Sequence, residues 1–327
     1  MRILYRSAKG EIHSDLPAEQ LPAALQEEGG ILWVDINGDS VDDGARILSD
    51  VFAFHHLAVD DTINEVHLPK VDDWHEYLYL VLRGLEYDDG NYRAHLPELD
   101  VFLGTHFLVT FHYDEIPAVD RVWEASAEDE RLLENNCAYL LYRIMDELVG
   151  HYITTVEALE EALERVENQI LVRPTTQSQG RILALKHTVL RLRRVTSLQR
   201  EVLNKLARDP YTVLEDADRV YFRDVYDHMI RLYELIDGLR DLVMSALDLY
   251  LSALNNRMNE IMKTLTVITT LFMPLTFVTG FFGMNFFQPV LASLAPWTGQ
   301  VAYIVTLLLM VLVPVVMFLW MRRRAWM

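Results

Sequence analysis

The stretch "TLTVITTLFMPLTFVTGFFGMNF", residues 264–286, decides the architecture of this chain because it is a long apolar run without a charge. The 58 residues from Thr264 to Met321 contain no Asp, Glu, Lys, Arg or His. A helix needs about 20 residues to cross a hydrocarbon core, and residues 264–284 and 301–321 each reach that length. Residues 285–300 between them contain two prolines and a glycine, which favour a turn. We therefore predict two membrane spans joined by an external loop.

The distribution of basic residues predicts the orientation of the two spans. Arg257 and Lys263 precede the first span, arginines at 322–324 follow the second, and the loop has no basic residue. By the positive-inside rule, both termini are expected in the cytoplasm and the spans in the cell (inner or plasma) membrane. Residues 322–327 then form a basic cytoplasmic tail. The only cysteine, Cys137, fits a reducing compartment.

The charge of the chain limits its partners. The 327 residues carry a net charge of −19, and all 48 acidic residues lie before position 261. Such a cytosolic part argues against nucleic acid as a partner. It suits cations, although a solvated acidic face is equally ordinary for a soluble domain. No G-x-x-x-x-G-K-[ST] motif occurs, so no nucleotide partner is predicted. We expect neither an enzyme nor an organic cofactor.

The first 209 residues predict an α+β cytosolic domain. Strand-like runs occupy residues 31–36, 77–87, 98–104 and 106–112, with hairpin turns expected at "LGTHF" and "YDDGNY". Helical patterns fall between the first two of these strands. Two long amphipathic helices are expected later, over residues 139–172 and 181–207.

A single very long helix is predicted to connect the cytosol to the membrane. Between Pro210 and Pro274 there is no proline and only one glycine, Gly238. A helix over about residues 211–284 would be roughly 110 Å long. We assign 210–263 to a cytosolic stalk, 264–284 to the first span, 285–300 to the loop and 301–321 to the second span. A lone helix of this kind needs partners, which implies bundling with copies of itself.

One face of this helix is small, polar or methionine throughout. Steps of four and three residues align these positions: Asp248, Ser252, Asn255, Asn259, Met262, Thr266, Thr269, Met273, Thr276 and Gly280. The neighbouring stripe is apolar: Leu251, Leu254, Met258, Ile261, Leu265, Ile268, Phe272 and Leu275. Small residues are also ordinary helix–helix contacts in membranes. Because the polar stripe continues into the cytosolic stalk, we favour a pore. Two spans cannot enclose one, so an oligomer is required.

Several segments of this chain resemble the CorA family of magnesium channels. The match lies in "MPLTFVTGFFGMNF" (273–286), "YFRDVYDH" (221–228), "LDLYLSALNNRMNEIMKTLT" (247–266) and "VDDTINEVHLPKVDD" (59–73). The resemblance implies a funnel-shaped homopentamer with an αβα cytosolic domain, a long pore-lining helix and a second span outside it. It also implies passive Mg²⁺ influx driven by the membrane potential, with Co²⁺ and Ni²⁺ as secondary ions.

The resemblance assigns residues to the pore. Gly283, Met284 and Asn285 would form the outer mouth, where five Asn285 amides accept hydrogen bonds from the waters around Mg²⁺, an ion that sheds water reluctantly. The inner constriction would be formed by Asn259, Met262 and Leu265, with Met273 and Thr276 higher in the pore. Here the helical periodicity differs from the resemblance, because it places Thr266 rather than Leu265 on the pore axis.

The resemblance also implies regulation by intracellular Mg²⁺. The metal would bind between neighbouring subunits, with Asp61 on one, Asp224 on the next and Asp60 assisting. A second cytosolic site is not expected, because Gly150 and His151 stand where the family has an acid. The loop also lacks the acidic residue common after G-M-N, which leaves Asn285 to act alone at the mouth.

Two other functions remain open from the sequence. A related zinc transporter with proton coupling is suggested by the histidines at positions 55, 56, 67 and 75, although no H-x-x-x-H pair lies on a clear helix face. A membrane-anchored scaffold or sensor without transport is the third hypothesis, and His187 on a helix is the residue that suggests it. Uptake of metal into liposomes separates these three functions.

Overall fold

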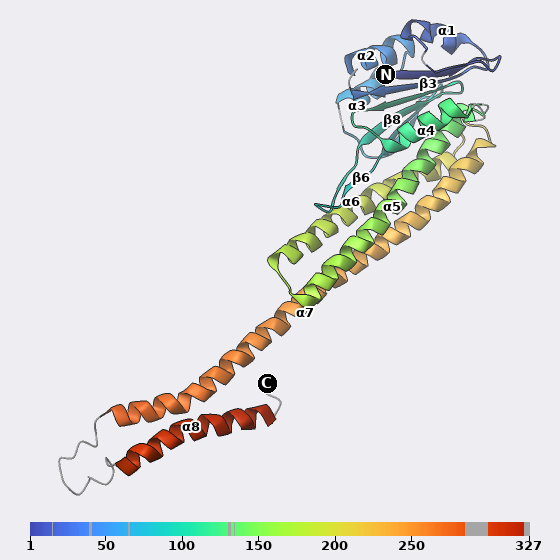
Figure 1. The fold of residues 1–327 in the computed structure, drawn as a ribbon. Coiled ribbons are helices and arrows are strands. Elements are labelled where there is room, and N and C mark those ends of the chain that lie inside the picture. Colours follow the sequence, from blue (N-terminus) through green and yellow to red (C-terminus); the bar gives the residue numbers. More distant parts are fainter. Residues whose placement is uncertain are drawn as a thin grey trace. The chain divides into compact units, whose positions relative to one another are not determined.

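The computed structural model describes residues 1–14, 16–38, 41–64, 66–129, 132–133, 135–284 and 300–323. The chain divides into two compact units, Met1–Leu249 and Tyr250–Met327, and one helix, α7 (Asp218–Gly283), runs through the boundary. Figure 1 shows that the strands all belong to the N-terminal unit. The predicted pore face of α7 therefore begins in one unit and continues in the other.

A mixed sheet forms the centre of the first unit. Its seven strands lie in the order β2-β1-β3-β9-β8-β5-β4. The strands are β1 (Arg2–Arg6), β2 (Ile12–His13), β3 (Ile31–Asn37), β4 (Lys70–Asp73), β5 (Leu78–Arg83), β8 (Glu98–Leu103) and β9 (Phe107–His112). Only β3 and β9 pair in parallel, with Leu32 opposite Phe107, and every other pair is antiparallel. The strands β6 (Glu86–Asp88) and β7 (Arg93–His95) form a hairpin that is a separate two-stranded sheet.

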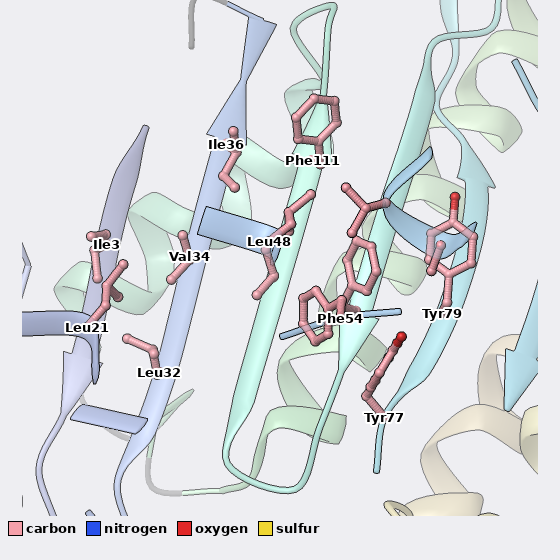
Figure 2. Packing of buried hydrophobic residues seen from close by; sticks show 14 of the residues in the cluster. Ile3, Leu21, Leu32, Val34, Ile36, Leu48, Phe54, Tyr77, Tyr79 and Phe111 are labelled. Carbon is pink, nitrogen blue, oxygen red and sulfur yellow. The ribbon is translucent and has the colours of Figure 1, made fainter. Parts of the chain in front are cut away.

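Short helices cover one face of the sheet. They are η1 (Ala18–Gln20), α1 (Leu21–Gln26), α2 (Val41–Arg46), the π-helical turn η3 (Ile47–Val51) and α3 (His56–Asn64). Leu21 and Leu48 from these helices pack on alternate residues of β3, such as Val34 and Ile36, because successive strand side chains point to opposite faces. Figure 2 shows Phe54 lying between this aliphatic group and the side chains of Tyr77 and Tyr79.

Longer helices cover the opposite face. α4 (Pro117–Glu128) contributes Trp123, whose ring meets that of the buried Trp33 edge-on at 4.9 Å. α5 (Cys137–Val172) contacts the central strands, and α6 (Thr176–Arg208) contacts β4 and β5. The N-termini of α5 and α6 are capped by Asn136 and Thr175, which accept hydrogen bonds from backbone N–H groups. Helices on both faces make an αβα arrangement, as predicted.

The burial of side chains on helix α7 changes along its 66 residues. Up to Tyr250 it buries an apolar stripe, which consists of Phe222, Val225, Met229, Leu232, Ile236, Leu239, Val243, Ala246 and Tyr250. After Tyr250, no residue of α7 whose side chain the structure describes is buried. The second long helix of this unit is α8 (Gln300–Arg323). The apolar parts of α7 and α8 are both long enough to cross a membrane.

The strand and long-helix predictions are confirmed, with one shift in the start of a helix and with some strands missed. The four predicted strand runs contain β3, β5, β8 and β9, and both hairpin turns are present. Helix α7 begins at Asp218 rather than near 211, because the Asp218 carboxylate accepts hydrogen bonds from the Glu215 N–H (2.9 Å) and the Asn136 amide (2.7 Å) and fixes a turn there. Strands β1 and β4 were not predicted.

Candidate cation pathway and cation-sensing carboxylates

The candidate pore residues on α7 are exposed in the single chain. Met262 is 55% exposed and Met273 is 66% exposed, and the other described positions of the polar stripe are exposed as well. Leu265 is also 55% exposed. Exposure alone therefore does not decide between Leu265 and Thr266 as the residue on the pore axis, and both stay predictions. Asn285 and the loop that follows lie outside the described residues.

The threonines of this stripe direct their hydroxyl hydrogens into the helix. The Oγ1 atoms of Thr266, Thr269 and Thr276 donate to the carbonyl oxygens four residues earlier, at 2.8, 2.9 and 3.0 Å. A hydroxyl has one hydrogen and two lone pairs. Since the hydrogen is used within the helix, the exposed part of each hydroxyl is an acceptor. An acceptor suits a cation or the waters that surround one.

Two backbone features mark the C-terminal half of the apolar segment of α7. Pro274 lies inside α7, and because proline has no N–H, the carbonyl of Thr270 lacks its usual helical donor. Gly280 and Gly283 have open space around the position of an added Cβ, with no atom within 4 Å. Packing within one chain therefore does not require glycine at either position.

Asp61, the first candidate regulatory ligand, already has a cationic partner. Its Oδ2 atom lies 2.6 Å from Nζ of Lys70 on β4, and that same Nζ lies 2.9 Å from Oδ2 of Asp72. His67 also lies near Asp61, with its Nε2 atom 3.7 Å from Asp61 Oδ1. Burial lowers the pKa of Lys70, but the hydrogen bonds to Asp61 and Asp72 outweigh burial and leave that pKa above its ordinary value. Lys70 is therefore an ammonium group at neutral pH.

The neighbouring acids around Asp61 are engaged within the fold. Glu98 is paired with Arg83 at 2.6 Å, and burial raises the pKa of its carboxyl. Asp100 accepts a hydrogen bond from Tyr79 Oη at 2.6 Å, and burial raises its pKa well above the ordinary value. Lys70 Nζ lies 5.0 Å from the Tyr79 ring and covers this pair. Asp61 and Asp72 are the carboxylates that Lys70 contacts at this edge of the sheet.

Asp60 and Asp224, the other candidate ligands, are both exposed. Asp60 precedes Asp61 on α3, whereas Asp224 lies on α7. Asp60 accepts a hydrogen bond from the side-chain amide of Asn64 at 2.7 Å. Asp224 belongs to α7, which packs on α5 through the Tyr139–Tyr221 ring contact at 5.2 Å. Because α3 and α5 cover opposite faces of the sheet, one chain does not bring Asp61 and Asp224 together. Among the described residues, no group of three or more His, Cys, Asp or Glu is placed to hold a metal ion.

The donor chemistry of Asp61 nevertheless fits Mg²⁺. Carboxylate oxygens are preferred ligands of this ion, and the Asp61 side chain is 28% exposed beside the edge strand β4. The sequence reasoning missed Lys70 as the partner of Asp61. The signal was present in "LPKVDD" (68–73), where a lysine precedes two acids in a polar strand.

The histidines that suggested zinc do not form one cluster. His55 stacks on Trp74 at 4.3 Å between ring centroids, and His67 faces Asp61 and Glu98. His151 is half-buried on α5, where burial and the charge of Arg121 lower its pKa. The expectation that no second cytosolic site exists at Gly150 and His151 stays a prediction.

Comparison with known proteins places the chain in a family. The family model described as "CorA-like Mg2+ transporter protein" matches residues 28–323. The chain belongs to the CorA family. It is 32% identical over 296 residues to the cobalt/magnesium transport protein CorA of Thermotoga maritima, across 90% of this chain and 83% of that protein. Membership in the CorA family makes this chain a divalent cation transporter and not an enzyme.

Two more comparisons concern the fold and the alternative ion. The CorA magnesium transporter from Methanocaldococcus jannaschii superimposes with a TM-score of 0.82 at 23% identity, over 100% of this chain and 99% of that one. The CorA fold therefore extends along the whole chain. The zinc transport protein ZntB of Yersinia pseudotuberculosis is 23% identical over 269 residues, which cover 82% of this chain and 79% of that protein. Identity is thus lower to this zinc transporter than to the cobalt/magnesium transporter.

Proposed function

We propose that this chain is a Mg²⁺ channel that mediates passive influx driven by the membrane potential, with Co²⁺ and Ni²⁺ as secondary ions. The observation that carries the proposal is the polar stripe of α7, which continues without a break from Asp248 into the apolar segment as far as Gly280. Exposed side chains on this stripe support a role outside the single chain. The cobalt and magnesium specificity of the Thermotoga relative supports the choice of ions.

The proposed assembly is a homopentamer in the inner membrane with both termini in the cytoplasm. Residues 1–209 are its regulatory domain, 210–263 its stalk, 264–284 and 301–321 its spans, 285–300 its external loop and 322–327 its basic tail. The exposed apolar side chains of α7 after Tyr250 support this assignment, because they need lipid or neighbouring helices to cover them.

The membrane potential is sufficient to drive the ion inward. A divalent cation gains about 4.6 kcal/mol per 100 mV of inside-negative potential, twice the monovalent figure. Mg²⁺ enters the mouth with its water shell, and a ring of Asn285 amides accepts hydrogen bonds from those waters. Gly283 and Met284 complete the mouth. A neutral ring releases the ion more readily than a carboxylate ring does.

Closure is assigned to the inner end of the pore and to the cytosolic acids. Rings of Met262 and Leu265 form an apolar constriction that excludes water, with Asn259 on its cytosolic side. Intracellular Mg²⁺ bound by Asp61 of one subunit and Asp224 of the next, with Asp60 nearby, offsets the repulsion between carboxylates. Loss of this Mg²⁺ lets the subunits separate and the constriction fill with water.

Uptake into liposomes tests the proposal. Purified full-length protein is reconstituted, and entry of Mg²⁺ and of Zn²⁺ is followed with and without a potential and with and without a pH gradient. We expect Mg²⁺ uptake that increases with inside-negative potential and ignores the pH gradient. Absence of Mg²⁺ uptake under a potential contradicts the proposal.

Zinc transport with proton coupling is the second candidate, since ZntB is among the relatives of this chain. It predicts Zn²⁺ uptake that depends on the pH gradient. The same liposome experiment distinguishes it, because only this candidate responds to pH in the absence of a potential. A preparation that admits neither ion contradicts both candidates.

A further inference from the structure

The ammonium group of Lys70 occupies the place at Asp61 that a cation would take. Its Nζ lies 2.6 Å from one Asp61 oxygen and 2.9 Å from one Asp72 oxygen. Lys70 is the first residue of β4, whereas Asp61 is on α3, so this contact joins the edge strand to helix α3. Both side chains are partly exposed, Lys70 at 29% and Asp61 at 28%, so the contact can open without unfolding the core.

Metal binding at Asp61 has to displace this ammonium group. Two cations that share one carboxylate repel each other, and the repulsion is weakly screened where the groups are partly buried. Asp72 gives the displaced lysine a second partner, because its carboxylate already lies within hydrogen-bonding distance. The Tyr79 ring beneath Nζ, 5.0 Å away, favours the charge at both positions. Lys70 therefore has a place to move to when a metal takes Asp61.

We propose that Lys70 is an internal competitor for the Asp61 carboxylate and sets the Mg²⁺ concentration at which the cytosolic site fills. This inference rests on the proposed sensing role of Asp61. Lys70 is a positioning residue that acts through Asp61 rather than a ligand. Without it the site would fill at a lower Mg²⁺ concentration, and a stronger cationic partner at this position would move filling to a higher one.

The test is a titration of the full-length protein in detergent with Mg²⁺, read as protection of the cytosolic domain from protease. We expect Lys70→Met to lower the midpoint of protection about tenfold, the equivalent of about 1.4 kcal/mol. Lys70→Arg keeps the charge and can pair with both carboxylates, so its midpoint should equal or exceed that of the wild type. Lys186→Met removes the same charge from α6 and should leave the midpoint unchanged.

The variants separate failure of this inference from failure of the sensing role. If the wild type shows no protection, or if Asp61→Ala retains the wild-type midpoint, Asp61 is not a sensor and both proposals fall. If Asp61→Ala shifts the midpoint while Lys70→Met behaves like Lys186→Met, only the competition is wrong. A midpoint for Lys70→Arg below that of the wild type also overturns it, even if Lys70→Met does not fold. In the Asp61→Ala background, Lys70→Met should have no further effect.

Discussion

The two units of this chain differ in how far their apolar side chains are buried. In the first unit, strand residues such as Leu80 and Trp33 are fully buried between helices that the same chain supplies. In the second unit, Phe272 is 62% exposed and Leu308 is 61% exposed. The first unit thus contains its own hydrophobic core, whereas the second is a pair of apolar helices whose surroundings must supply the rest. The proposed pore depends on that difference, because only uncovered helix faces are free to line a pore.

The largest effect is expected at the outer mouth. Asn285→Ala should abolish Mg²⁺ uptake in liposomes while the oligomer stays intact in detergent, because the amide ring that receives the hydrated ion is lost. Asn168→Ala, which removes an exposed amide from α5, is the matched control and should transport normally. Normal uptake by Asn285→Ala would falsify the assignment of the mouth.

The difference in burial can be tested directly with two leucines. Leu80→Ala should destabilise the first unit by about 2–5 kcal/mol, because it leaves a cavity in a packed core. Leu308→Ala on α8 should leave the unfolding of that unit unchanged. Thermal unfolding of full-length protein in detergent measures both. Equal losses from the two substitutions would mean that the two units do not differ in burial as described.

A smaller effect is expected from the buried pair between His112 and Asp35. His112 Nε2 lies 3.2 Å from Asp35 Oδ1, and Asp35 also accepts from Arg2 Nε at 2.8 Å and Thr110 Oγ1 at 2.5 Å. Burial lowers the pKa of His112, but the bond to Asp35 outweighs it and raises that pKa. Burial raises the pKa of Asp35, but hydrogen bonds from His112 and Thr110 leave it lowered. His112→Gln should cost about 1.5–3 kcal/mol at slightly acid pH.

The pH dependence of this loss has a definite sign. A raised His112 pKa contributes stability that is full below about 6.5, the ordinary value for histidine, and that disappears as the pH rises through the raised value. The lowered Asp35 pKa removes its own contribution as the pH falls through that lowered value. The difference in stability between wild type and His112→Gln should therefore shrink from slightly acid to alkaline pH. A difference that grows with pH contradicts this account.

The smallest effect is expected at the inner constriction. Met262→Ser should raise basal Mg²⁺ flux at high internal Mg²⁺, because a polar ring no longer excludes water. Met258→Ser is the matched control, since Met258 is similarly exposed (58% against 55%) but belongs to the apolar stripe. If both substitutions raise the flux equally, the constriction is not confined to the polar stripe, and the assignment of Met262 to it loses its basis.

Much of the fold was predictable because its signals are local. The long helices α5, α6 and α7 follow from repeating apolar positions and from proline placement, and β3, β5, β8 and β9 are predominantly apolar runs. Strand β4 escaped prediction because its sequence, "KVDD", is polar and becomes a strand by backbone pairing with β5. Strand β1 is a five-residue run at the N-terminus whose partner β3 lies about 30 positions later.

The candidate site was predictable only in part, for a related reason. The face of α7 follows from the 3.6-residue period, so the polar stripe was visible in the sequence. The partner of Asp61 was not, because Lys70 reaches it from a strand whose position depends on the whole sheet. The direction of the threonine hydroxyls also required coordinates, since a threonine can donate to its own helix or to a neighbour.

The hydroxyls of these threonines can interact with ions only as an ether oxygen does, and not as an alcohol does. An alcohol solvates both signs of charge, because it offers a proton to anions and lone pairs to cations. An ether has only lone pairs, and it leaves anions unsolvated. Thr266, Thr269 and Thr276 each donate their hydroxyl hydrogen bond to a carbonyl oxygen of α7. An anion beside these three oxygens therefore has no hydroxyl hydrogen bond to accept, whereas a cation has three acceptor oxygens on one face of the helix.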